Sequence, residues 1–235
     1  MKIVGLQKVS LIDFPERIAA TVFIGGCNLD CGYCHNRWMI DAGAIEPIMA
    51  PAELLEWLAT RQGKLDGVCF TGGEPCSDPS LPGLIRDVGA LGFAIKLDTN
   101  GAYPDCLQAL LENALLDYVA MDVKAPLDAR YAETVRVPMP LDHLLRSLHR
   151  SMNLLRQSDV PYEFRTTVHP LLDEQALLDL AEQLEPDDIW VLQPFEPTPE
   201  VLPEIRAMPA LSPADLVALL PRLREIIPGV TLRAL

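Results

Sequence analysis

The chain has 235 residues and carries 33 acidic against 19 basic side chains, which gives a formal net charge of −14 at pH 7. This charge argues against a nucleic acid as partner, because a nucleic-acid backbone favours a basic protein face. No apolar run reaches the length of a transmembrane helix, and the first residues lack the long apolar core of a signal peptide. We therefore expect a cytoplasmic protein that does not enter a membrane and that keeps its six cysteines as thiols.

The length suits one large α/β domain, so we predict a single domain over residues 1–235. Residues 18–24 form a nearly continuous apolar run, as in a strand that is buried on both faces. A cysteine-rich loop follows, and Pro51 then opens a helix. Strands and helices alternate from there on. We expect strands at 67–70, 93–97, 118–121, 162–168 and 189–192, and a short edge strand at 230–232. We expect helices at 81–91, 104–113, 141–157 and 172–184, and a last helix from 212 or 213 to about 227.

This alternation predicts a parallel sheet with right-handed crossovers. The six clear β-α units fall short of the eight of a closed barrel, so we predict a partial, open (β/α)6 barrel with its core at about residues 15–195. The Pro-rich stretch after it cannot be a long helix or a central strand. We expect residues 196–235 to form a loop that borders the barrel opening, followed by the last helix.

Three cysteines lie within eight residues, at the spacing C-x3-C-x2-C: Cys27, Cys31 and Cys34. Three neighbouring thiolates favour a soft metal or an iron–sulfur cluster. A structural zinc site would need a fourth ligand, and His35 could supply it only with awkward geometry, since it directly follows Cys34. A four-iron cluster held by three cysteines leaves one iron open to a substrate. Three ordinary thiols remain the alternative.

Polar residues follow several of the predicted strands, where the loops of parallel barrels build active sites. They are Gly72, Gly73 and Glu74 after the second core strand, Asp98 after the third, Asp122 and Lys124 after the fourth, and Gln193 after the last. Each has a structural alternative, such as a capping turn at Asp98 or an exposed ion pair at Asp122 and Lys124. We expect Glu74 to lie on an exposed rim, where substitution changes stability by less than about 0.5 kcal/mol.

The cysteine spacing, with Tyr33 before the third thiol and Gly-Gly-Glu on the next strand, resembles the radical S-adenosylmethionine (SAM) superfamily. In that family SAM chelates the open iron of a [4Fe–4S] cluster. The larger set of motifs, from Ser10-Leu-Ile-Asp-Phe-Pro15 to Arg165-Thr-Thr-Val-His169-Pro, resembles the activating proteins of anaerobic ribonucleoside-triphosphate reductase. The resemblance covers most of residues 1–195.

The resemblance implies reductive cleavage of SAM to methionine and a 5′-deoxyadenosyl radical, which takes a hydrogen atom from a backbone glycine of a partner enzyme. It also implies a flavodoxin- or ferredoxin-type electron donor. In the implied site the cluster is bound by Cys27, Cys31 and Cys34, and the adenine lies along Tyr33 and His35. The SAM amino group is held by Gly72, Gly73 and Glu74, the SAM carboxylate by Lys124, and the ribose by Gln193. The methionine end and a monovalent cation lie near Asp98 and Asp122.

Two other functions stay open. One is a small radical SAM enzyme that acts on a small molecule or peptide, such as a deazapurine-forming enzyme. The other is an iron–sulfur electron carrier, in which the Gly-Gly-Glu segment and Lys124 would have no purpose. Arg165 could bind an anionic ligand or pair with an aspartate such as Asp98 or Asp122, and the sequence leaves both open. It assigns no role to His169, or to the remaining cysteines, Cys69, Cys76 and Cys106, beyond the small core residues that scattered thiols usually are.

Overall fold

A computed structural model describes residues 1–136 and 139–233 of the chain. It is an α/β structure whose eight strands follow one another in chain order, from β1 to β8. The chain divides into two compact units, described separately below. Unit 1 consists of Met1–Asn28, Trp38–Ala120 and Ser147–Pro161, and unit 2 consists of the described parts of Leu29–Arg37, Met121–Arg146 and Tyr162–Leu235.

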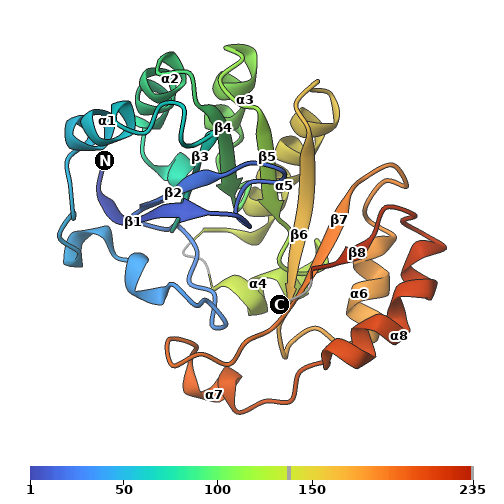
Figure 1. The fold of residues 1–235 in the computed structure, drawn as a ribbon. Coiled ribbons are helices and arrows are strands. Elements are labelled where there is room, and N and C mark those ends of the chain that lie inside the picture. The colour runs from blue at the N-terminus through green and yellow to red at the C-terminus, as the bar shows by residue number, and fades with distance from the viewer. Residues whose placement is uncertain (137–138, 234–235) are drawn as a thin grey trace. The chain divides into compact units, whose positions relative to one another are not determined.

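Unit 1 carries the first strands and the helices that follow them (Figure 1). Its strands are β1 (Ile3–Ser10), β2 (Ala19–Ile24), β3 (Gly67–Gly72) and β4 (Ala94–Thr99), and its helices are α1 (Pro51–Ala59), α2 (Leu81–Ala90) and α3 (Pro104–Glu112), with short 3-10 helices at Ala42–Ala44 and Pro75–Ser77. Strand β1 pairs with β2 antiparallel, whereas β2, β3 and β4 pair in parallel. Figure 1 shows α1, α2 and α3 side by side along the same strands.

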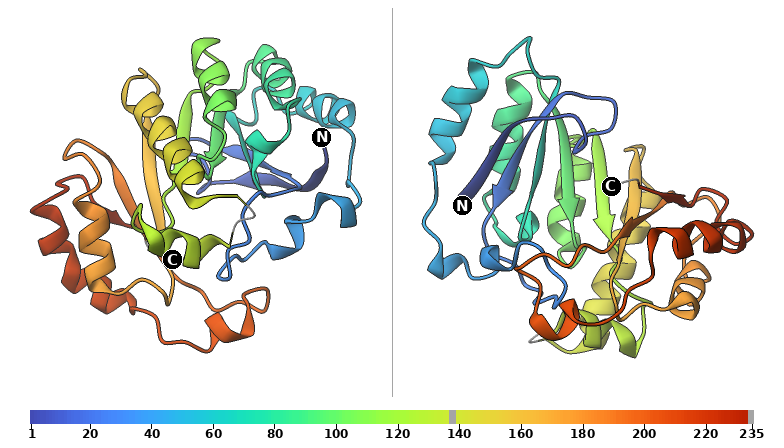
Figure 2. Two further views of the ribbon diagram at one scale, coloured as in Figure 1. Left: turned by 180° about the vertical axis from the view of Figure 1, so that it is seen from behind. Right: turned by 60° about the horizontal axis from the view of Figure 1, so that its bottom comes forward.

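Unit 2 carries the last strands, β6 (Tyr162–Val168), β7 (Trp190–Pro194) and β8 (Thr231–Leu232), which pair in parallel. Its helices are α4 (Ala129–Val135), α6 (Glu174–Ala181), α7 (Pro203–Arg206) and α8 (Pro213–Arg224). Figure 2 shows α6 and α8 packed together beside β7 and β8. Strand β5 (Tyr118–Asp122), helix α5 (Leu141–Arg156) and the 3-10 helix Arg37–Met39 cross from one unit to the other.

The starts of the helices follow from local chemistry. Proline occupies one of the first two positions of α1, α2, α3, α7 and α8, where its missing N–H leaves no helical hydrogen bond unmade. The Asp173 side chain accepts a hydrogen bond from the Ala176 N–H at the start of α6, and Ser212 caps α8 in the same way. The apolar side of α1 is buried, at Leu54 and Leu58.

The predicted α/β class and the six units in which a parallel strand precedes a helix, β2 to β7, are confirmed. Strand β1 lies outside the predicted strands, because its residues from Gln7 to Val9 are exposed and give no continuous apolar run. Helix α4 was missed because prolines flank it on both sides. The Pro-rich segment contains α7 and is therefore not a plain loop.

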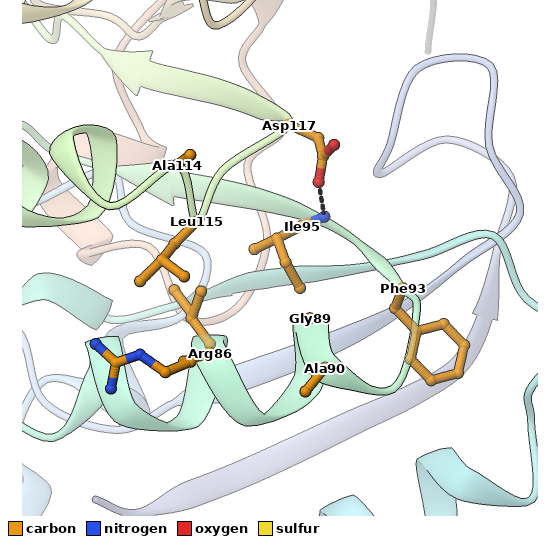
Figure 3. Close-up of a pocket in the computed structure, with 9 residues that line it drawn as sticks. Arg86, Gly89, Ala90, Phe93, Ile95, Ala114, Leu115 and Asp117 are labelled. Carbon is orange, nitrogen blue, oxygen red and sulfur yellow. Dashed lines mark hydrogen bonds between the residues drawn. The ribbon is translucent and has the colours of Figure 1, made fainter.

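No helix among the described residues is long and apolar enough to cross a membrane. The surface of unit 1 has a hollow of about 390 Å³ at the amino ends of β4 and β5 (Figure 3). Phe93, Ile95 and Leu115 give it apolar walls, and the Asp117 carboxylate accepts a hydrogen bond of 2.7 Å from the Ile95 N–H. It lies at the opposite ends of these strands from the polar residues predicted to build a site.

Candidate active site

The Gly-Gly-Glu segment of unit 1 lies directly against the backbone that leads into Cys27. The Gly73 N–H donates to the Ile24 carbonyl at 2.8 Å, and the Glu74 N–H donates to the Gly26 carbonyl at 2.7 Å. Gly72 has a φ of +125°, and a Cβ placed on it would lie 2.4 Å from the Ile24 oxygen. A Cβ on Gly73 would lie 2.1 Å from the Gly26 oxygen. The chain itself therefore requires both glycines, whatever ligand they contact.

We expect Gly73→Ala to lower the free energy of unfolding by about 3 kcal/mol, because the new methyl group would clash with the Gly26 carbonyl. This backbone cannot move away without separating the ends of β2 and β3. Gly83→Ala is the matched control, since a Cβ on Gly83 of helix α2 has nothing within 4 Å and alanine favours a helix. Urea unfolding of both variants measures the difference. Equal stabilities would show that the close approach at Gly73 is not real.

Glu74 is fully buried, so the expected exposed rim position is wrong. Its Oε1 accepts hydrogen bonds from the Cys76 N–H at 3.0 Å and from the Thr99 hydroxyl at 2.8 Å, and its Oε2 accepts one from the Asn100 N–H at 2.6 Å. The carboxylate thereby ties the segment after β3 to the turn after β4. Glu74 is a structural residue of unit 1 in addition to any contact with a ligand.

Asn100 connects this carboxylate to the first cysteine. Its Nδ2 lies 2.9 Å from Asn28 Oδ1 and 3.9 Å from Cys27 Sγ. Unit 1 thus brings Cys27, Glu74 and Asn100 together at the carboxyl ends of β2, β3 and β4. The sequence alone predicts a role for Asp98 but none for Asn100. The polar Asn directly after a buried strand was the available signal.

Asp98 lies in β4, two residues after the buried Lys96, and the Lys96 ammonium makes an ion pair with its Oδ1. The Lys96 Nζ also lies 3.8 Å from the Sγ of Cys69, its register partner in β3. Sequence reasoning missed Lys96, although a lysine inside an otherwise apolar strand is an unusual choice. Of the cysteines outside the motif, Cys69 and Cys76 are buried as expected, and the Sγ atoms of Cys76 and Cys106 lie 2.8 Å apart.

In unit 2, Asp122 at the end of β5 lies between two cations. Its Oδ2 is 3.1 Å from the Lys124 Nζ and its Oδ1 is 3.0 Å from the Arg165 Nε. Burial opposes the charge of Asp122, but Arg165 and Lys124 outweigh this effect and lower its pKa from 3.8 to about 2. Arg165, for which the sequence left open an anionic ligand or an aspartate, therefore pairs with Asp122.

Tyr33 and His169 stack in unit 2, with ring centroids 4.1 Å apart and planes 15° from parallel. The His169 Nε2 lies 3.0 Å from the Lys124 carbonyl, and its Nδ1 accepts from the Leu171 N–H at 3.3 Å. A carbonyl on one ring nitrogen and an N–H on the other fit a neutral imidazole that carries its proton on Nε2. Burial lowers the pKa of His169 from 6.5 to about 4, in agreement with this pattern.

We expect His169 to make the protein less stable as the pH falls from about 6.5 to about 4. The histidine of the unfolded chain binds a proton below about pH 6.5, whereas buried His169 in the folded protein binds one only below about pH 4. Between these two pH values protonation therefore favours the unfolded chain, and the full stability is present above about pH 6.5. A shift of 2.5 units corresponds to about 3 kcal/mol. Unfolding titrations from pH 7 to pH 4 should give a shallower slope of stability against pH for His169→Gln than for the wild type. Identical slopes would contradict the buried neutral state.

The Pro-rich segment supports the cysteine loop within unit 2. The Leu202 N–H donates to the Gly32 carbonyl at 2.9 Å, and the buried Ile205 lies against Gly32. The Cys31 carbonyl accepts from the Cys34 N–H at 3.1 Å and from the Arg37 guanidinium at 2.9 Å. Residues 202–205 therefore hold the backbone between the second and third cysteines.

The thiols of the motif have the chemistry that an iron–sulfur cluster needs. Among the described residues none of the three forms a disulfide, and polar donors face two of them: the Asn36 N–H lies 3.3 Å from Cys34 Sγ, and the Asn100 amide faces Cys27 Sγ. Hydrogen bonds to sulfur stabilise the anionic form that binds iron. Within residues 1–136 and 139–233 no three His, Cys, Asp or Glu side chains already converge as a metal-binding group. Cys27 belongs to unit 1, and Cys31 and Cys34 belong to unit 2.

Two further predicted residues can be placed. The buried Nε2 of His35 has no hydrogen-bond partner among the described residues, and its ring lies 6.3 Å from that of Phe195, centroid to centroid. Such an unpartnered buried nitrogen leaves a hydrogen bond for a ligand to make. Gln193 is half-buried near the end of β7, opposite Thr167 of β6.

Comparisons with known proteins identify the family of the chain. The model of the radical SAM superfamily matches residues 21–184. A Methanocaldococcus jannaschii protein described as a "putative glycyl-radical enzyme activating enzyme" is 30% identical over 237 residues, which cover 98% of this chain and 95% of that protein. The 7-carboxy-7-deazaguanine synthase of Neisseria meningitidis serogroup B is 33% identical over 113 residues, 48% of this chain and 47% of that enzyme.

Among solved structures, Streptococcus suis SuiB bound to its precursor peptide SuiA matches with a TM-score of 0.67 at 14% identity, over 91% of this chain and 48% of SuiB. At this identity the match shows the fold alone. The family match spans more than half of the chain, and the M. jannaschii relative is similar from end to end. The chain therefore belongs to the radical SAM superfamily and, within it, to the glycyl-radical enzyme activating enzymes, so it is an enzyme of radical chemistry that works with a [4Fe–4S] cluster and SAM.

Proposed function

We propose that Cys27, Cys31 and Cys34 hold the [4Fe–4S] cluster and that the neighbouring strand ends hold SAM. When bound, the cluster and SAM supply reductive cleavage of the sulfonium and a 5′-deoxyadenosyl radical. The residues proposed to contact SAM are Tyr33, His35, Gly72, Gly73, Glu74, Asp98, Asp122, Lys124 and Gln193. In this proposal the whole chain acts as one radical SAM domain.

The protein's own residues prepare this site in three ways. The Gly72–Gly73 backbone approaches the segment before Cys27 so closely that no side chain fits between them. The fixed carboxylate of Glu74 supplies negative charge, which suits the SAM ammonium group. The Lys124 ammonium is half-buried and desolvation opposes its charge, but Asp122 beside it raises its pKa well above the ordinary value, so it stays charged for a carboxylate ligand.

We further propose that the substrate is a backbone glycine of a partner enzyme, and that this partner is an anaerobic ribonucleotide reductase. The similarity of nearly the entire chain to the M. jannaschii protein, described as a putative glycyl-radical enzyme activating enzyme, supports a glycine as substrate. The resemblance of the sequence motifs supports the reductase as the partner. A flavodoxin- or ferredoxin-type protein in the cytoplasm supplies the electron.

A labelling experiment tests the substrate. The reduced, cluster-loaded protein is mixed with SAM and with a reductase whose glycines carry deuterium on the α-carbon. We expect 5′-deoxyadenosine that contains one deuterium, measured by mass spectrometry, and none of this product when the partner is left out. Cys31→Ala is the inactive control, and Cys106→Ala, which changes a thiol outside the motif, should behave like the wild type.

The similarity to 7-carboxy-7-deazaguanine synthase supports a second candidate, an enzyme that acts on a small heterocycle. That similarity covers 48% of the chain, compared with 98% for the activating enzyme. The same assay separates the two functions. If 5′-deoxyadenosine forms with a small heterocycle and stays unlabelled with the reductase, the small-molecule function replaces the activase function.

A further inference from the structure

Lys96 is a charged residue in the interior of strand β4. Its side chain is 2% exposed, and it points to the same side of the strand as Asp98, two residues further on. The ammonium group contacts the Asp98 carboxylate and the Cys69 thiol. Burying a lysine is costly unless its charge is matched, and the aspartate provides the match. Neither the family comparison nor the proposed function gives Lys96 a purpose.

The resemblance to activating enzymes implied a monovalent cation near Asp98 and Asp122. The residues present do not fit such an ion, because protein cations already contact both carboxylates. Lys96 contacts Asp98 within unit 1, and Lys124 and Arg165 contact Asp122 within unit 2. A potassium or sodium ion on either carboxylate would lie within a few ångströms of a like charge in a partly buried place, where such repulsion is strong.

We propose that the Lys96 ammonium takes the place of the monovalent cation at Asp98, so that this protein binds SAM without potassium or sodium. Lys96 is then a positioning residue: it acts on SAM through Asp98 by fixing the carboxylate and balancing its charge. This inference rests on the proposed role of Asp98 in SAM binding. If the ion pair were purely structural, replacing Lys96 would not make SAM binding depend on which salt is present.

The experiment measures the dissociation constant of SAM by isothermal titration calorimetry on the cluster-loaded protein, in potassium, sodium or choline chloride at one ionic strength. Choline is too large to replace a metal ion between side chains. For the wild type we expect the same affinity in all three salts, within about twofold. For Lys96→Met we expect affinity about tenfold weaker in choline, with most of the loss recovered in potassium or sodium. Lys96→Arg keeps the charge and should stay independent of the salt.

A second readout needs no SAM. Thermal unfolding of Lys96→Met should shift upward when potassium replaces choline, whereas the wild type and Lys96→Arg should show no such shift, because only the methionine variant has room and charge for the ion. The double variant Lys96→Met/Asp98→Asn removes both charges and should be independent of the salt again. It also preserves the test if the single variant folds poorly.

The outcomes separate the inference from the function on which it rests. Wild-type protein that needs potassium or sodium to bind SAM overturns the inference and leaves the function intact. A Lys96→Met variant that loses the same affinity and the same stability in every salt also overturns it, since Lys96 would then be merely structural. Wild-type protein that binds no SAM in any salt would contradict the proposed function itself.

Discussion

Replacing Cys31 by alanine is expected to abolish both the cluster and SAM cleavage. With two thiolates left, the loop cannot hold a four-iron cluster, which needs three protein ligands when SAM occupies the fourth iron. Anaerobic reconstitution should give about four irons per wild-type chain and close to none for the variant. Iron and sulfide analysis, together with the visible absorption of the reconstituted protein, measures this result.

Cys106→Ala is the matched control, since Cys106 is a half-buried thiol outside the motif. It should keep the full iron content and the wild-type spectrum. The corresponding variants at Cys27 and Cys34 should behave like Cys31→Ala. A triple variant that retains all its iron would show that other residues bind the metal.

Glu74→Gln is expected to lower the free energy of unfolding by about 2 kcal/mol, although it changes only one atom of the side chain. In the wild type, both carboxylate oxygens of Glu74 accept hydrogen bonds from donors. The glutamine amide replaces one of these oxygens by an NH2 group, which then faces another N–H or a hydroxyl in a buried place. SAM affinity should fall as well, because the negative charge disappears. Urea unfolding and calorimetric SAM titration of the folded variant measure the two effects.

Glu112→Gln on the exposed end of α3 provides the comparison, because its carboxylate accepts only from Gln108 among the contacts described. It should change stability by less than about 0.5 kcal/mol. If Glu74→Gln were as stable as this control, the three hydrogen bonds to the carboxylate would have no structural weight. If it were unstable yet bound SAM normally, Glu74 would serve the fold alone.

The fold was largely predictable from the sequence because parallel strands buried on both faces give continuous apolar runs. Strand β6 was predicted with its observed bounds, and most other elements to within a few residues. Strand β1 was not predicted, because this antiparallel strand has exposed residues and is stabilised by its pairing with β2 rather than by an apolar pattern of its own. Helix α4 has seven residues, which is too short for a periodic signal, and it begins at a local aspartate cap, Asp128.

The motif residues of the site were identified from the sequence, but their partners were not. The spacing of the cysteines and the glycines reflects local chemistry that a sequence shows directly. The Glu74 interactions with Thr99 and Asn100 join residues some 25 positions apart, which only the packed strand ends bring together. The stacking of Tyr33 on His169 and the ion pair of Asp122 with Arg165 join still more distant positions. No periodic pattern encodes such pairs.

Electron paramagnetic resonance of the partner enzyme tests the central claim most directly. The reduced protein is incubated with SAM and an anaerobic ribonucleotide reductase, and the spectrum is recorded after the activating protein has been removed. We predict a doublet signal on the reductase that collapses to a single line when its glycines carry deuterium on the α-carbon, since the α-hydrogen causes the splitting. A reductase that never acquires this signal, while the protein binds its cluster and cleaves SAM, would contradict the account.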